Sequence, residues 1–363
     1  MRATTKKVSL NVVSYSYYER SEFLIVFYMF ALRKLYNNKN MTKLIYITRA
    51  IPEVGIQIMK DNGYIVDIGS TDDAPSKDEL IKTLSQKPYD ALVSFLTDSI
   101  DKEIFDACPT IKIVAQYAVG FNNINLEDAK ERNIVITNTP GCSSRAVAEH
   151  AVALMLSLTT RATEGDEYIR SGKFTGWMPG LLNGVDLTGK TIGILGGGAI
   201  GQEVASILHF GFNCPIIYSD VKENIFLKEK IGATFMDKES LLKQSDIVTL
   251  HVPLLPTTKH LINKDTFSLM KKEAFLINTS RGPVIDEVAL VEALKNGVIK
   301  GAGLDVFEFE PAITAGLEDI PDVVLTPHIA SSRASVRAEM AKIVGQNVVN
   351  FFEKGVALNE ASC

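Results

Sequence analysis

From Lys43 onward, short apolar runs alternate with longer amphipathic stretches. The apolar runs are rich in β-branched residues and are three to six residues long, as expected for buried strands. Strands separated by helices are joined by crossovers, so the pattern predicts an α/β fold with parallel sheets covered on both faces. The expected strands are 44–47, 64–66, 91–93, 111–114, 134–136, 191–195, 215–218, 247–252, 274–278, 302–306 and 323–325.

A glycine-rich turn follows the apolar run 191–195 and precedes a helix-forming stretch. Gly196, Gly198 and Gly201 match the dinucleotide fingerprint G-x-G-x-x-G in the strand–turn–helix context that it requires. The helix beginning near Ala199 and Ile200 would offer free N–H groups to a pyrophosphate. Glycine-rich turns also recur for structural reasons alone, so the motif needs support from the residues around it.

Asp220 supplies that support, because it ends the next apolar run, 215–218. An acid about 20 residues beyond the glycines can accept hydrogen bonds from the adenosine ribose hydroxyls. A carboxylate there would repel a 2′-phosphate, so the sequence favours NAD over NADP. The alternative for Asp220 is a solvated turn residue.

Composition narrows the class of protein. A length of 363 residues suggests about two domains, and 46% hydrophobic with 22% charged residues allows a sizeable core. The net charge of −5 argues against a nucleic-acid surface. No metal site or disulfide framework is expected, because the four cysteines have no C-x-x-C spacing. The simplest inference is a cytoplasmic protein.

Residues 1–40 differ from the rest of the chain and are interpreted as a dispensable extension. Their one apolar run, 23–32, is too short for a bilayer span, so no membrane association is expected. The globular pattern begins after Met41.

The order of the elements predicts two domains. A long helix is expected from Ser331 towards Lys354, after the last strand, and would return the chain to the first domain. Residues 41–140 and 329–363 would form a substrate domain, and 141–328 an inserted NAD-binding domain. Both would be parallel-sheet domains of the Rossmann-like or flavodoxin-like type, with the active site in the cleft between them.

Three residues stand just beyond consecutive strands of the second domain, namely Arg281, Glu310 and His328. Ligands of open parallel sheets bind at the carboxyl ends of the strands, so these side chains can meet near a nicotinamide. Histidine is a suitable proton donor, a neighbouring carboxylate would favour its imidazolium form, and arginine can bind a carboxylate. Each residue alone could equally be structural. Together they predict reduction of a 2-keto acid.

The sequence resembles the D-isomer-specific 2-hydroxyacid dehydrogenase family, and most closely its glyoxylate/hydroxypyruvate reductases. The likeness covers nearly all of residues 41–355. The family-wide stretches are 118–124, 138–141, 147–156, 196–201, 278–282, 303–311 and 326–329. The stretches shared with the reductases are 161–177, 251–254 and 305–308.

The resemblance implies roles for individual residues. Arg281 would bind the substrate carboxylate and keto oxygen, with His328 as the acid/base and Glu310 as its partner. The backbone at Val119 and Gly120 would help to hold the substrate. Phe95 and Leu96 would form the pocket wall, and Asp305 would contact the nicotinamide carboxamide. The remaining cofactor contacts would be the fingerprint residues, Asp220, Pro253, Thr258 and Thr279.

Departures from the family pattern bear on the substrate. Only 35 residues follow His328, which leaves no room for the regulatory domain of many phosphoglycerate dehydrogenases. Glu310 replaces the glutamine typical of formate dehydrogenases. The Asn123-Ile124-Asn125 stretch lacks the acid that the family usually carries at its first or last position, with no clear consequence for the chemistry.

The leading hypothesis is an NAD-dependent reductase of a small 2-keto acid such as glyoxylate or hydroxypyruvate. Alternatives are a dehydrogenase of another 2-hydroxy acid, including D-lactate and 3-phosphoglycerate, and an NAD-sensing corepressor-like binding protein. The preferred keto acid, the strictness for NAD and the physiological direction stay open. A homodimer is expected, since the long apolar helix 143–160 and the excursion through Trp177 exceed what one sheet can cover.

Overall fold

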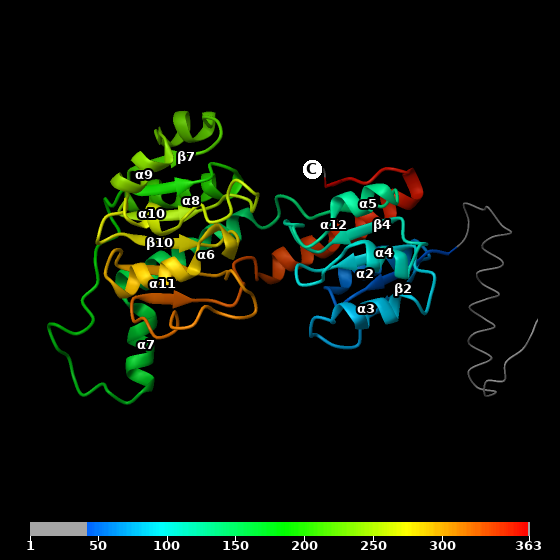
Figure 1. Ribbon diagram of the computed structural model, residues 1–363, viewed down its shortest axis with the longest axis horizontal. Coiled ribbons are helices and arrows are strands. Elements are labelled where there is room, and N and C mark those ends of the chain that lie inside the picture. The colour runs from blue at the N-terminus through cyan, green and yellow to red at the C-terminus, as the bar shows by residue number, and fades with distance from the viewer. Residues whose placement is uncertain (1–41, 362–363) are drawn as a thin grey trace, which may run out of the picture.

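The computed structural model describes residues 42–361, and the predictions made for residues 1–40 lie outside this range. Two α/β bodies make up the described chain (Figure 1). Each contains one sheet whose paired strands are all parallel, as the alternating sequence pattern predicted. No helix in the described part of the chain is long and apolar enough to cross a membrane.

The first sheet has five strands in the order β2-β1-β3-β4-β5, with a reversal of strand order between β1 and β3. Its central strands are buried on both faces, which explains why each begins with three consecutive apolar residues. The strands are β1 (Leu44–Ile47), β2 (Ile65–Ile68), β3 (Ala91–Ser94), β4 (Ile113–Gln116) and β5 (Val135–Thr137). The connecting helices are α2 (Glu53–Asp61), α3 (Lys77–Leu84), α4 (Lys102–Ala107) and α5 (Leu126–Glu131).

Helix α12 (Ala334–Lys354) extends from the second body towards the first and packs against α2 (Figure 1). Two glycines allow the helices to approach closely. A Cβ added to Gly55 would lie 2.3 Å from the carbonyl oxygen of Ala341, and one added to Gly345 would lie 2.6 Å from that of Gly55. Met340 and Val344 of α12 are buried in the core of the first sheet. The two ends of the described chain therefore share one hydrophobic core.

The second sheet has seven strands in the order β12-β11-β10-β9-β6-β7-β8, and its strand order reverses between β6 and β9. This is the doubly wound arrangement in which nucleotides bind at the reversal point. The strands are β6 (Ile192–Leu195), β7 (Ile216–Ser219), β8 (Thr234–Phe235), β9 (Ile247–Leu250), β10 (Phe275–Asn278), β11 (Gly301–Leu304) and β12 (Val323–Leu325).

Helices cover this sheet, and α6 packs against both α8 and the β10–β12 strands. The main helices are α6 (Ser144–Thr160), α7 (Ala162–Arg170), α8 (Ala199–Phe212), α9 (Lys238–Gln244), α10 (Lys264–Phe267) and α11 (Glu287–Lys295), with a π-turn at Leu227–Ile231 and a 3-10 turn at Gly282–Val284. After α7 the chain makes a long excursion away from both bodies before it enters β6 (Figure 1).

A serine that precedes an apolar helix predicts an N-terminal cap, and the start of α6 differs from this prediction. Ser143 stands at the N-cap, but its side chain makes no capping hydrogen bond. Its φ of −107° and ψ of −5° are not those of an extended capping residue, so its hydroxyl does not accept from the first turn. Proline is favoured at the first helical position, which predicts Pro52 inside the first turn of α2, but Pro52 precedes the helix as its N-cap residue.

Candidate active site

The carboxyl ends of the neighbouring strands β10, β11 and β12 bring together the three residues predicted to carry the chemistry. Arg281 follows β10, Glu310 follows β11 and His328 follows β12. The loops that carry them begin side by side because the strands are parallel and in register.

His328 and Glu310 form a direct pair, with 2.9 Å between His328 Nδ1 and Glu310 Oε2. The other oxygen of Glu310 accepts from the Phe307 N–H at 3.0 Å. Burial raises the pKa of Glu310, but the hydrogen bond and charge of His328, the Phe307 N–H and the Arg281 charge outweigh it and hold the pKa below its usual value. Glu310 is therefore ionised near neutral pH. His328 Nε2 has no hydrogen-bond partner among the described residues.

Arg281 reaches across to the first domain. Its Nε donates to Asn122 Oδ1 at 3.1 Å, and its Nη1 donates to the Ser280 carbonyl at 2.6 Å. Gly120 lies directly against the guanidinium, because an added Cβ would be 1.9 Å from Arg281 Nη2. Burial lowers the pKa of Arg281 and the Glu310 carboxylate opposes that effect. The arginine thus stands beside both the backbone expected to bind substrate and the His328–Glu310 pair.

Asp305 organises the turn that carries His328. Its Oδ1 accepts from the Ile329 N–H and its Oδ2 from the Ala330 N–H, both at 2.8 Å, and its carbonyl accepts from the His328 N–H at 2.9 Å. His328 has a φ of +52°, a left-handed conformation that costs about 1–3 kcal/mol in a non-glycine residue. The buried carboxylate holds the backbone in this conformation. Its predicted contact with a nicotinamide stays a prediction.

The glycine turn has the geometry of a phosphate cradle. Gly196 has a φ of +100°, and a Cβ there would lie 2.6 Å from the carbonyl oxygen of His251. A Cβ at Gly201 would lie 2.2 Å from the Gly196 oxygen. Gly198, by contrast, faces open space, and α8 begins immediately after it at Ala199 and Ile200. The open side of the turn and the N-terminus of the helix fit a pyrophosphate.

Asp220 lies at the end of β7 beside this turn. Its Oδ2 accepts from the Gly197 N–H at 2.7 Å, and its Oδ1 accepts from the Val221 N–H at 2.6 Å. The carboxylate is therefore fixed next to the cradle, at the place where a ribose would follow the pyrophosphate.

Two buried polar atoms at the ends of β9 and β10 lack hydrogen-bond partners in the described chain, namely His251 Nδ1 and Thr279 Oγ1. Burial lowers the pKa of His251 to about 3, so its ring is neutral at physiological pH. Unpaired buried polar atoms are costly and are commonly satisfied by a ligand. Together with the glycine cradle, they fit a bound dinucleotide. Thr279 was predicted as a cofactor contact and His251 was not.

Comparison with known proteins decides the family. The model for "D-isomer specific 2-hydroxyacid dehydrogenase, NAD binding domain" matches residues 152–330. A glyoxylate reductase from Thermococcus litoralis is 44% identical over 315 residues, which cover 86% of this chain and 94% of the relative. The chain belongs to the D-isomer-specific 2-hydroxyacid dehydrogenase family. It is an NAD-dependent enzyme of that family.

Solved structures of the same family have the same architecture. A glyoxylate reductase from Paecilomyes thermophila superposes with a TM-score of 0.78 at 29% identity, covering 88% of this dehydrogenase and 98% of that chain. The NADPH-dependent glyoxylate/hydroxypyruvate reductase from Sinorhizobium meliloti, in complex with NADP and malonate, has a TM-score of 0.76 at 28% identity, with coverage of 89% and 97%.

The other predicted contacts of the dehydrogenase lie on loops at the same edges of the two sheets. Thr258 donates to the Pro253 carbonyl at 2.6 Å, so the loop after β9 holds these two residues together. Val119 is held by Asn138, whose Nδ2 donates to its carbonyl at 2.7 Å. Leu96 follows β3 and is half-buried. Their contacts with cofactor and substrate stay predictions.

His150 and Thr326 also belong to the site and were not predicted. His150 Nε2 lies 2.9 Å from Thr326 Oγ1 and 3.3 Å from Asp305 Oδ1, and Thr326 donates to the same carboxylate oxygen at 2.6 Å. These contacts, against the effect of burial, hold the pKa of Asp305 below its usual value. The only sequence signal was a histidine within the apolar helix 144–160.

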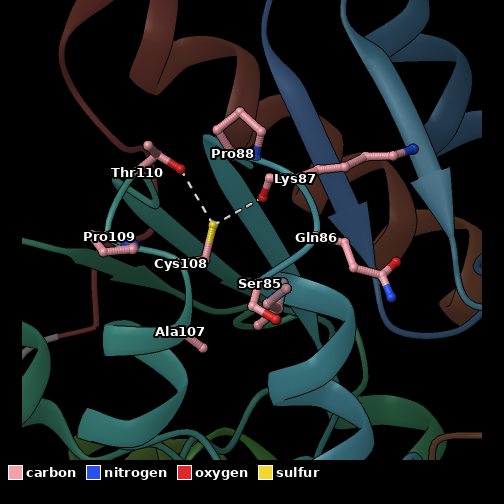
Figure 2. A pocket seen from close by; sticks show the side chains of 9 residues that line it. Ser85, Gln86, Lys87, Pro88, Ala107, Cys108, Pro109 and Thr110 are labelled. Carbon is pink, nitrogen blue, oxygen red and sulfur yellow. Dashed lines mark hydrogen bonds between the residues drawn. The ribbon is translucent and has the colours of Figure 1, made fainter. Parts of the chain in front are cut away.

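No group of three or more His, Cys, Asp or Glu side chains that could hold a metal ion occurs within residues 42–361. A small pocket around Cys108 lies between the segments that lead into β3 and β4, at the sheet edge opposite the active site (Figure 2). Cys108 Sγ lies 3.5 Å from the Lys87 carbonyl and 3.3 Å from Thr110 Oγ1. Burial raises the pKa of this thiol, which keeps it protonated and unreactive.

Proposed function

We propose that this dehydrogenase reduces a small 2-keto acid of the glyoxylate or hydroxypyruvate type to the D-2-hydroxy acid. The observation that carries the proposal is the His328–Glu310 pair at 2.9 Å, with Arg281 next to it and a dinucleotide cradle on the same sheet. The glyoxylate reductase from Thermococcus litoralis supports the same substrate class.

The residues have distinct tasks in this proposal. Arg281 binds the substrate carboxylate and orients the keto oxygen, helped by the N–H groups at Val119 and Gly120. His328 donates the proton on Nε2 to the keto oxygen as that oxygen becomes a hydroxyl, and Glu310 stabilises the imidazolium through Nδ1. Bound NADH would supply the hydride to the carbonyl carbon. In the reverse direction, His328 accepts the proton from the alcohol.

The cofactor would bind along the second sheet. Gly196, Gly198 and Gly201, with the N–H groups at Ala199 and Ile200, would hold the pyrophosphate, and Asp220 would accept from the ribose hydroxyls. Thr279, together with the loop holding Pro253 and Thr258, would line the remaining part of the cofactor site.

The proposal includes a homodimer, formed with a second copy of the chain. The segment formed by α7 and the excursion after it exposes large apolar side chains, including Trp177 at 83% and Phe174 at 53%. Exposed apolar patches of this kind mark interaction surfaces, which supports a homodimer. A cytoplasmic location stays a prediction.

The decisive experiment is steady-state turnover with NADH against a panel of 2-keto acids. The proposal expects the highest kcat/KM for glyoxylate or hydroxypyruvate. A clear preference for pyruvate or 3-phosphohydroxypyruvate would favour the D-lactate or phosphoglycerate alternatives. NADH binding without turnover of any keto acid would favour a binding protein and contradict the proposal.

A further inference from the structure

Asn123 joins two loops of the first domain that lead into the active site. One loop follows β3 and contains Phe95, Leu96 and Asp98, and the other follows β4 and contains Gly120. Asn123 Nδ2 donates to the Phe95 carbonyl at 2.9 Å and to the Asp98 carbonyl at 2.7 Å. Both of its amide hydrogens are therefore used to hold the opposite loop.

Gln116 completes the link. Its Nε2 donates to Asn123 Oδ1 at 2.8 Å and to the Gly120 carbonyl at 3.3 Å. Its Oε1 accepts from Ser94 Oγ at 2.6 Å, and both Gln116 and Ser94 are fully buried. Every donor and acceptor of the two amides has a partner, so the network has a single orientation.

The far side of the loop after β3 is also held. The buried Asp98 accepts from Thr48 Oγ1 at 2.6 Å and from the Phe95 N–H at 2.8 Å, and its other oxygen lies 3.2 Å from Arg49 Nη2. The Arg49 guanidinium also stacks 4.3 Å from the centre of the Phe95 ring. The loop is thus anchored on one side to Thr48 and Arg49, which directly follow β1, and on the other side to the segment carrying Gly120.

We propose that Asn123 is a positioning residue that sets the width of the substrate pocket, by holding the loop of Phe95 and Leu96 at a constant distance from Gly120. This inference rests on the proposed function, in which Gly120 helps to bind the substrate, and on the family resemblance, which implies that Phe95 and Leu96 form the pocket wall. The ligand class is a 2-keto acid with a short substituent beyond the keto carbon. A rigid pocket rejects larger substituents because the loop cannot yield.

The hydrogen bonds of this network require an amide side chain at position 123. An aspartate has nearly the same shape but only accepts hydrogen bonds, so it would face two carbonyl oxygens without a donor. Repulsion between these oxygens would separate the loops. Asn125 provides a matched control only two residues away. Its Oδ1 accepts from the Glu127 and Asp128 N–H groups at 3.1 Å as the N-cap of α5, a role that aspartate fills equally well.

The test compares Asn123→Asp with Asn125→Asp, using kcat and KM for glyoxylate, pyruvate and phenylpyruvate and the Kd of NADH. Asn123→Asp is expected to raise KM for glyoxylate about tenfold or more, and to shift the kcat/KM ratio towards the larger keto acids. NADH binding should not change, because the cofactor cradle lies in the other domain. Asn125→Asp should match the unmodified enzyme in every parameter.

Asn123→Ser removes the two amide donors without adding a charge. It should also shift kcat/KM towards the larger keto acids relative to glyoxylate, but by less than Asn123→Asp does. An unchanged ratio in folded Asn123 variants, or loss of folding in both, would overturn the positioning role and leave the proposed function intact. No turnover of any keto acid by the unmodified enzyme would overturn both proposals together.

Discussion

At the scale of single residues, the proposed site depends on the contact between the Glu310 carboxylate and the His328 ring. Glu310 keeps its negative charge because its pKa lies below the usual value, and it touches the ring nitrogen of His328 at 2.9 Å. Neutral imidazole cannot donate a proton to a developing alkoxide as readily as imidazolium can. The carboxylate therefore stabilises the imidazolium from which His328 would donate its proton in the proposed reaction.

Replacing Glu310 by Gln should shift the pH dependence of ketone reduction. The variant keeps the shape but removes the charge that favours imidazolium, so the upper pH limit of ketone reduction should move down. A pH–rate profile of kcat/KM measures this shift. Glu318→Gln is the control, since within residues 42–361 Glu318 accepts only from the Gly316 N–H in a separate turn. Coincident profiles for Glu310→Gln and the unmodified enzyme would contradict the pairing.

Gly120 should tolerate no side chain. An alanine Cβ would lie 1.9 Å from Arg281 Nη2 and would push the guanidinium away from the substrate. Displacement of a binding group by about 1 Å can cost about 10²-fold in rate, so kcat/KM should fall by about this factor. Gly211→Ala is the matched control, because no atom lies within 4 Å of the added Cβ. If Gly120→Ala keeps normal kinetics, Arg281 does not need this close approach.

At the scale of elements, the turn after β12 depends on the buried carboxylate of Asp305. The three residues His328, Ile329 and Ala330 all donate their N–H groups to Asp305. The carboxylate is thus a structural anchor for the turn that carries His328, and His150 and Thr326 contact it from the other side.

Asp305→Asn should lower the stability of the protein at neutral pH. It should also make that stability depend less on pH in the acid range. The pKa of Asp305 in the folded protein lies below its ordinary value of 3.8. Its stabilising contribution is therefore fully present above about pH 3.8 and is lost as the pH falls below that value. Thermal melting from pH 7 to pH 3 should show a difference in Tm between the two proteins that narrows at the acid end. A constant difference would contradict the ionic role.

The sequence predicted the parts of the site that follow from strand order. Arg281, Glu310 and His328 each stand beyond the end of an apolar run, and parallel strands bring such ends together. His150 and Asn123 could not be found in this way. The contact of His150 with Asp305 depends on how α6 is rotated over the sheet. The contact of Asn123 with the Asp98 carbonyl depends on how two loops bend. Periodicity assigns elements, but it does not identify partners between them.

At the scale of the whole molecule, the proposed active site is formed by residues of both domains. The Arg281–Asn122 hydrogen bond connects a loop of the second sheet with one of the first. Helix α12 returns the chain to the first domain and packs on α2, so two segments cross between the bodies (Figure 1).

The exposed segment after α7 should hold two copies together. Trp177→Ser with Phe174→Ser would remove its two most exposed aromatic side chains and should weaken the dimer. Sedimentation equilibrium at micromolar concentration measures the change, and Phe210→Ser, at an exposed site on α8, is the control. A monomeric unmodified protein would contradict the proposed assembly.

The most direct test of the central claim is kcat of His328→Ala with NADH and glyoxylate, together with the Kd of NADH. If His328 is the proton donor, kcat should fall by about 10²–10⁴-fold, the usual contribution of a positioned general acid, while NADH binding stays within about twofold. A His328→Ala enzyme with unchanged kcat would contradict the account.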